Sequence, residues 1–84
     1  MTDLEFDVLD ELYFVLDFDQ LQSELELEEM VLVETLEMLY QKEWIRCYTS
    51  HDQEVEAGQA NIKGKFQEYL YLASKKGLLA HNAD

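Results

Sequence analysis

Apolar residues near the start of the chain recur at steps of three and four, a spacing typical of an amphipathic helix. This pattern predicts a first helix from about Asp3 to Leu16. Thr2 and Glu5 match the T-x-x-E capping box that marks a helix start. The positions that carry the apolar spacing are Leu4, Val8, Leu9, Leu12, Tyr13 and Leu16.

The next segment predicts two further helices. Asp17 or Asp19 can cap a short second helix that buries Phe18, Leu21 and Leu25. A third helix is expected from about Glu28 to Lys42, because acids in its first turn and a base in its last turn suit the helix dipole. Its inward side chains are expected to be Leu32, Thr35, Leu36 and Leu39.

The pattern changes at Trp44. Residues 44–49 are β-branched and aromatic with rough alternation, which predicts a strand. A polar turn at residues 50–53 and a returning strand at residues 54–56 would complete a hairpin, followed by an irregular stretch at residues 58–64.

A last helix is expected from Lys65 or Phe66 to Lys75, with Gly77 as its C′ residue and a short apolar tail at residues 78–80. Because Tyr69 and Tyr71 cannot both face inward from one helix, one of them should be exposed. With 84 residues there is room for one core, so the sequence predicts a single domain over residues 1–84. The expected fold class is mainly α with a small β-hairpin.

The stretch Leu21-Gln22-Ser23-Glu24-Leu25-Glu26-Leu27, continued by Leu32, Leu36, Leu39 and Trp44-Ile45, resembles the winged helix-turn-helix family. The resemblance covers roughly residues 4–76 and implies three helices, a two-stranded wing and a C-terminal helix. Where the family usually has glycine or a small capping residue, this chain has Glu26, Glu28 and Glu43. At Glu43 this implies either a helix exit without positive φ or a small local strain.

Charge is distributed very unevenly. Residues 1–43 contain fourteen Asp and Glu but one base, Lys42, whereas the five acids and five bases that follow cancel, so the first part carries the whole net charge of −13. Such a surface repels phosphate, and each phosphate contact in a DNA complex needs a cation. Nucleic acid is therefore an unexpected partner.

The outward face of the third helix is the predicted binding surface. A DNA-reading helix offers Arg, Lys, Asn or Gln to base edges, but this one offers glutamates and apolar side chains. Methionine adapts to varied partners, so we expect a protein–protein interaction module whose partner could be basic. The predicted partner-binding residues are Met30, Val33, Glu34, Glu37 and Met38, with Gln41 at the end of the face.

Two other binding roles stay open. A winged-helix transcriptional regulator, as a monomer or a dimer, could bind DNA through Arg46, Lys63, Lys65, Lys75 and Lys76. An acidic decoy that mimics DNA is supported by the charge alone. The resemblance also implies that the C-terminal helix could form a homodimer, with one exposed tyrosine, Leu78 and Leu79 as the contact surface.

No catalytic, metal or cofactor residue is expected, and the sequence does not predict an enzyme. His51, Asp52 and His81 show no catalytic pattern, and the single cysteine, Cys47, can form neither an internal disulfide nor a multi-thiolate site. Two acidic series could attract a cation loosely, but a solvated helix face explains them better: Glu24, Glu28 and Glu29, and Asp3, Asp7 and Asp10. No signal peptide or membrane span is recognised, so a cytoplasmic location without membrane partners is expected.

Overall fold

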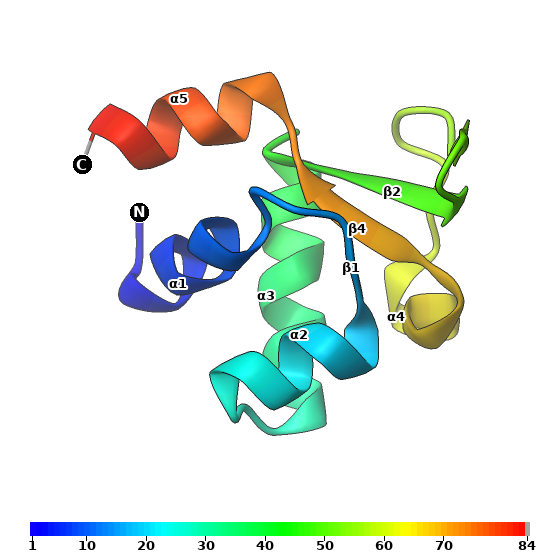
Figure 1. Ribbon diagram of the computed structural model, residues 1–84, viewed down its shortest axis with the longest axis horizontal. Helices are drawn as coiled ribbons and strands as arrows, with labels where there is room; N and C mark the ends of the chain where they lie inside the picture. Colours follow the sequence, from blue (N-terminus) through cyan, green and yellow to red (C-terminus); the bar gives the residue numbers. More distant parts are fainter. Residues whose placement is uncertain (84) are drawn as a thin grey trace.

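Short strands are interleaved with the helices in the computed structural model, which describes residues 1–83 (Figure 1). The predicted domain extended to Asp84, which lies outside the described residues. The elements in chain order are α1 (Asp3–Glu11), β1 (Leu16–Asp17), α2 (Phe18–Leu25), α3 (Glu29–Gln41), β2 (Ile45–Ser50), β3 (Gln53–Glu54), α4 (Ile62–Lys65), the 3-10 helix η1 (Phe66–Glu68), β4 (Leu70–Ala73) and α5 (Lys75–Ala83).

The predicted starts of the first three helices are confirmed. At α1, the Glu5 backbone N–H donates to Thr2 Oγ1 at 3.1 Å and the Thr2 N–H donates to Glu5 Oε1 at 2.9 Å, a complete capping box. Asp17 caps α2 in the same way with Gln20, at 2.8 and 3.0 Å. Helix α3 buries all four residues predicted to face inward.

The first helix is shorter than predicted, ending at Glu11 instead of Leu16. Leu12 is its C-cap, and the Leu12 carbonyl accepts a hydrogen bond from the Ala73 N–H at 2.9 Å. Further on, Leu16 and Asp17 pair with Tyr71 and Leu70 of β4. Residues 12–17 therefore leave the helix because a distant strand offers their backbone hydrogen bonds, which helical spacing alone does not reveal.

The four strands form one antiparallel sheet in the order β1-β4-β2-β3. The predicted hairpin is present as β2 and β3, but it is part of this larger sheet, in which β4 lies between β1 and β2. The protein is thus a small mixed α/β structure, not the mainly α structure with a two-stranded wing that the sequence predicted.

The predicted last helix at residues 65–75 was wrong. That stretch holds the end of α4, η1 and β4, and the C-terminal helix begins only at Lys75. Burial alternates with a period of two along Tyr69-Leu70-Tyr71-Leu72-Ala73, so the side chains of Tyr69 and Tyr71 face the same side. Both are buried, at 7% and 0% exposure, which also overturns the expectation of one exposed tyrosine.

Gly77 lies in the first turn of α5 and is not a C′ residue. A Cβ at this position would lie 2.0 Å from the Trp44 carbonyl oxygen. The absence of a side chain therefore lets α5 pass close to the start of β2. Residues 78–80, predicted to be a tail, continue this helix.

The core is one cluster of side chains from the helices and the sheet. Phe18 and Phe66 contact each other with ring centroids 4.6 Å apart, which ties α2 to η1. Helix α5 lies beside α1, so the two ends of the chain are on the same side of the molecule (Figure 1). Along this contact, the Phe6 and His81 rings stack with centroids 4.1 Å apart.

Candidate functional site

The outer face of α3 carries four of the five predicted partner-binding residues. Met30 and Met38 are 52% and 46% exposed, Glu34 is exposed and Glu37 is half-buried. Together with exposed Gln41 they follow the three- and four-residue spacing of one helix face. We call this set, Met30, Glu34, Glu37, Met38 and Gln41, the α3 stripe.

Val33 was assigned to this face wrongly, because it is 1% exposed and belongs to the core. Helix α3 contacts α1, α4 and β2, so its buried arc is wider than the row of Leu32, Leu36 and Leu39. The residue type could have indicated that Val33 is buried, because a β-branched apolar side chain next to a core leucine fits the edge of the buried face of a helix.

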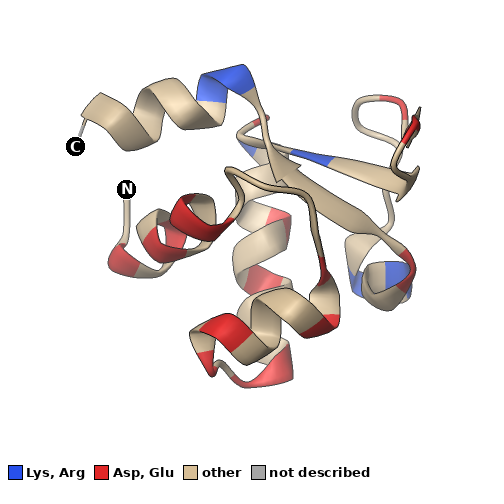
Figure 2. Ribbon diagram, viewed as in Figure 1, with Lys and Arg blue, Asp and Glu red and all other residues tan. Residues whose placement is uncertain are grey.

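The surroundings of the α3 stripe are acidic. Figure 2 shows Asp and Glu gathered on α1, α2 and the first part of α3, and Lys and Arg at the start of α5, on β2 and around α4. The one base of residues 1–43, Lys42, is held by Glu5: its Nζ lies 2.6 Å from Glu5 Oε2 and 4.6 Å from the centroid of the Trp44 ring. This half of the protein therefore offers no lysine that is free to bind phosphate.

Glu5 is an unusual member of the acidic set because it is buried, at 1% exposure. Burial raises its pKa, but the hydrogen bond from Lys42, the hydrogen bonds from Thr2 and the charge of Lys42 outweigh burial, so the pKa lies below its ordinary value of 4.5. Glu5 is thus a structural carboxylate that fixes Lys42, not part of the exposed surface.

Two glutamates near α3 have a left-handed backbone: Glu26 is the C-cap of α2, and Glu43 follows the C-cap of α3. Glu26 has a φ of 52° and Glu43 a φ of 64°, where glycine is the usual residue. Of the two outcomes expected at Glu43, the structure shows the strained one. Glu28 is the N-cap and makes no side-chain capping hydrogen bond, as its poor fit to that role suggested.

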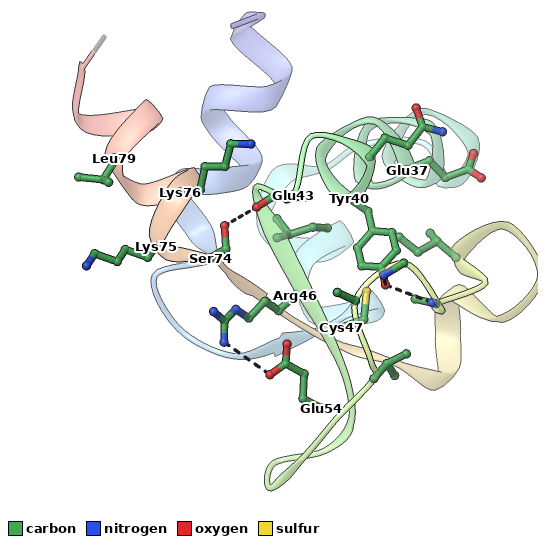
Figure 3. A pocket seen from close by; sticks show the side chains of 17 residues that line it. Glu37, Tyr40, Glu43, Arg46, Cys47, Glu54, Ser74, Lys75, Lys76 and Leu79 are labelled. Atoms are coloured by element: carbon green, nitrogen blue, oxygen red, sulfur yellow. Dashed lines mark hydrogen bonds and ion pairs between the residues drawn. The ribbon is translucent and has the colours of Figure 1, made fainter.

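A second feature, which the sequence did not indicate, is an open depression of about 1020 Å³ between α3, the β2–β3 hairpin, residues 55–62 and the start of α5. We call it the α3–α5 groove (Figure 3). Its buried lining residues include Ile45, Cys47 and Ile62. Its charged lining residues are Glu37, Glu43, Glu54, Arg46, Lys75 and Lys76.

Hydrogen bonds to the backbone hold the groove in shape. Tyr40 Oη accepts from the N–H groups of Gly58 and Ala60 at 2.9 and 3.1 Å, which fixes the loop opposite α3. Ser74 Oγ donates to the Glu43 carbonyl at 2.7 Å and accepts from the Gly77 N–H at 3.0 Å, so it joins the exit of α3 to the first turn of α5.

The end of α5 is anchored on α1. Tyr13 Oη lies 3.1 Å from His81 Nδ1 and donates to Asn82 Oδ1 at 2.8 Å, and His81 Nε2 lies 3.3 Å from Asp10 Oδ1. The sequence did not reveal this cluster because it joins residues nearly seventy positions apart. The last turns of α5 are therefore engaged within the chain, whereas Leu79, at 63% exposure, is free for a contact.

The residues considered for chemistry do not form a nucleophilic pair. Cys47 is buried in β2, and burial raises the pKa of its thiol to about 12, so the sulfur stays protonated at neutral pH. His51 is exposed in the turn between β2 and β3. Within residues 1–83, no group of three or more His, Cys, Asp or Glu side chains is placed to hold a metal ion.

Comparisons with known proteins gave no family: neither the protein-family models, nor the curated proteins, nor the solved structures contain a match to this chain. None of the helices in the described part of the chain is long and apolar enough to cross a membrane. The α3 stripe and the α3–α5 groove are therefore the two surface features that can indicate a function.

Proposed function

We propose that this chain is an acidic domain of the winged-helix type that binds a protein partner through the α3 stripe. The fold assignment is supported by the order of α1, β1, α2, α3, β2, β3 and β4, and by β1, β4 and β2 forming adjacent antiparallel strands. The left-handed turn at Glu26, between α2 and α3, supports it further.

The observation that carries the function is the pair of half-exposed methionines on a helix face that otherwise presents glutamates and Gln41. Exposed methionine offers adaptable apolar contact, and the glutamates favour a surface with opposite charge. The partner that fits is a protein with a basic, partly apolar surface.

DNA binding is the rival function, but the positions of the basic side chains give it little support. Arg46 lies 3.5 Å from Glu54, and Lys42 is paired with Glu5. The lysines of α4 and α5 are at opposite ends of the sheet in Figure 2 and form no single patch. Since DNA affinity grows with the number of cations that meet phosphates, protein binding is the function we propose.

A reducing compartment such as the cytoplasm is part of this proposal. Its support is that Cys47 is a free thiol enclosed in the core.

A retention experiment tests the stripe. Wild-type protein and the variant Met30→Ala/Glu34→Lys/Met38→Ala are immobilised side by side, and the proteins that they retain from lysate are quantified by mass spectrometry. We expect the variant to retain at least about tenfold less of the partner protein than wild type does, because apolar anchors and charge complementarity both contribute to binding. Asp52→Lys, on the exposed β2–β3 turn, is the matched charge-reversal control and should retain wild-type binding.

The same proteins are titrated with labelled duplex DNA at about 50 mM salt, where phosphate contacts are strongest. No binding is expected. DNA binding that fades as salt increases, or a set of retained proteins that is unaffected by the triple variant, would overturn the proposal.

A further inference from the structure

The α3–α5 groove differs from the rest of the molecule in charge. Its lining contains three acids, Glu37, Glu43 and Glu54, and three bases, Arg46, Lys75 and Lys76, and these formal charges cancel. The whole chain carries −13. Two copies repel each other through their acidic regions, and the groove is a region where they can approach without net repulsion.

Basic and acidic residues lie at opposite ends of the groove, except for Glu43, whose carbonyl accepts a hydrogen bond from Ser74 beside the lysines. Figure 3 shows Lys75, Lys76 and Leu79 on α5 at one end, and Glu37 and Tyr40 on α3 at the other. Arg46 and Glu54, 3.5 Å apart, lie between the two ends. A two-fold axis through this central pair would place the lysines of each copy against Glu37 on α3 of the other, as an isologous interface requires.

Apolar contacts are available at the same place. Leu79 is 63% exposed at the lysine end, whereas Tyr40 and Val55 line the groove and are half-buried. A single exposed leucine is ordinary. Leu79, however, lies on α5 with Lys75 and Lys76, the lysines that Glu37 of the other copy would attract. The same rotation therefore brings Leu79 of each copy toward the groove of the other.

We propose that the α3–α5 groove is the surface on which a second copy of this chain docks, with Lys75 and Lys76 of each copy facing Glu37 of the other. Acids on α2 lie at the opposite end of the molecule from the start of α5 (Figure 2). At 0.1 M salt the screening length is about 10 Å, shorter than the smallest dimension of the molecule, 19 Å, so their repulsion is reduced in the dimer.

The dimer refines the homodimer expected from the C-terminal helix, since it uses the first turn of α5 and leaves the end that packs on α1 in place. It does not depend on the proposed protein partner, because it is measured on the isolated chain. Glu37 belongs to both surfaces, and for this reason the partner test uses Glu34.

The test is sedimentation velocity with light scattering, over a concentration series of the purified full chain at about 0.1 M salt. Wild-type protein is expected to shift from monomer to dimer as concentration rises. Lys75→Glu/Lys76→Glu should weaken dimerisation at least tenfold. Lys63→Glu/Lys65→Glu makes the same change of net charge on α4, outside the groove, and should weaken it much less.

The variant Glu37→Lys separates specific pairing from general repulsion. This variant has a lower net negative charge, so general electrostatics would strengthen its association. The proposed pairing predicts instead that its dimerisation weakens at least tenfold. An equimolar mixture of this variant with Lys75→Glu/Lys76→Glu should recover dimer formation, because each mixed dimer restores attraction at its reversed pair of contacts. Circular dichroism confirms that each variant is folded before it is compared.

Three results would overturn the proposal: wild-type protein that stays monomeric up to about 1 mM, an α4 control that weakens the dimer as much as the α5 variant, or charge-reversed partners that fail to associate when mixed.

Discussion

Residues 1–43 and residues 44–83 differ both in charge and in how they are held together. The first region is strongly acidic, and its helices start at local signals, the capping boxes at Thr2 and Asp17. The second region is nearly neutral and is joined by contacts between distant residues, such as Ser74 with the Glu43 carbonyl. Local signals therefore shape much of the acidic region, whereas the neutral region depends on contacts that only the complete fold brings together.

The largest expected effect concerns close packing in the second region. Gly77→Ala would place a Cβ 2.0 Å from the Trp44 carbonyl oxygen, and the neighbouring Trp44 atoms are also backbone. Because backbone cannot move aside cheaply, we expect a loss of about 3 kcal/mol or more in the free energy of unfolding. Urea unfolding followed by circular dichroism measures it.

Gly58→Ala is the control for this prediction. Gly58 has a φ of +81° but nothing within 4 Å of an added Cβ, so only backbone strain remains, about 1 kcal/mol. Equal losses at the two glycines would mean that the approach of α5 to Trp44 is not a tight constraint.

The same division explains how much the sequence could predict. The starts of α1 and α2, the extent of α3 and the hairpin follow from signals within a few residues, and they were predicted. Strand β4 was not, because Tyr69-Leu70-Tyr71-Leu72-Ala73 is apolar on both faces and its strand character comes from pairing with β1 and β2. A short apolar run of this kind is ambiguous between helix and strand.

The candidate sites divide in the same way. Met30, Glu34, Glu37 and Met38 were placed on the exposed α3 face from helical spacing alone, whereas Val33 depended on which elements pack around α3. The α3–α5 groove could not be foreseen, because placing Lys75 and Lys76 beside it requires β4 to end at Ala73 and α5 to begin there.

The ion pair between Glu5 and Lys42 sharpens the comparison, because it is a partly buried link within the acidic region. Glu5→Gln keeps the shape of the capping residue but removes its charge, and we expect a loss of about 2 kcal/mol at pH 7. The folded pKa of Glu5 is depressed, so its contribution is present above pH 4.5 and is lost as pH falls through the folded pKa.

The stability difference between wild type and Glu5→Gln should therefore shrink as the pH is lowered below about 4.5, as measured by urea unfolding at several pH values. Comparing the two proteins cancels the contributions of the other carboxylates. A constant difference between pH 7 and pH 3 would show that the charge of Glu5 does not contribute.

Glu26 and Glu43, the two glutamates with positive φ, test whether the acidic region is less stable because it carries glutamate where glycine would fit. Glu26→Gly and Glu43→Gly should each raise the free energy of unfolding by about 1 kcal/mol, because glycine adopts positive φ without strain. Glu34→Gly, inside α3, removes the same side chain and should lower stability by about 1 kcal/mol. Destabilisation at all three positions would indicate that the carboxylates at Glu26 and Glu43 stabilise the fold.

The smallest effect is expected for Arg46 and Glu54 at the centre of the groove. Their charged atoms are 3.5 Å apart, and the side chains are 50% and 40% exposed, so solvent screens the pair. A double-mutant cycle with Arg46→Met and Glu54→Gln should give a coupling below about 0.5 kcal/mol in urea unfolding. A coupling above about 1 kcal/mol would instead mean that these side chains hold the hairpin closed across the groove, in which case a second copy would have to break that contact in order to dock.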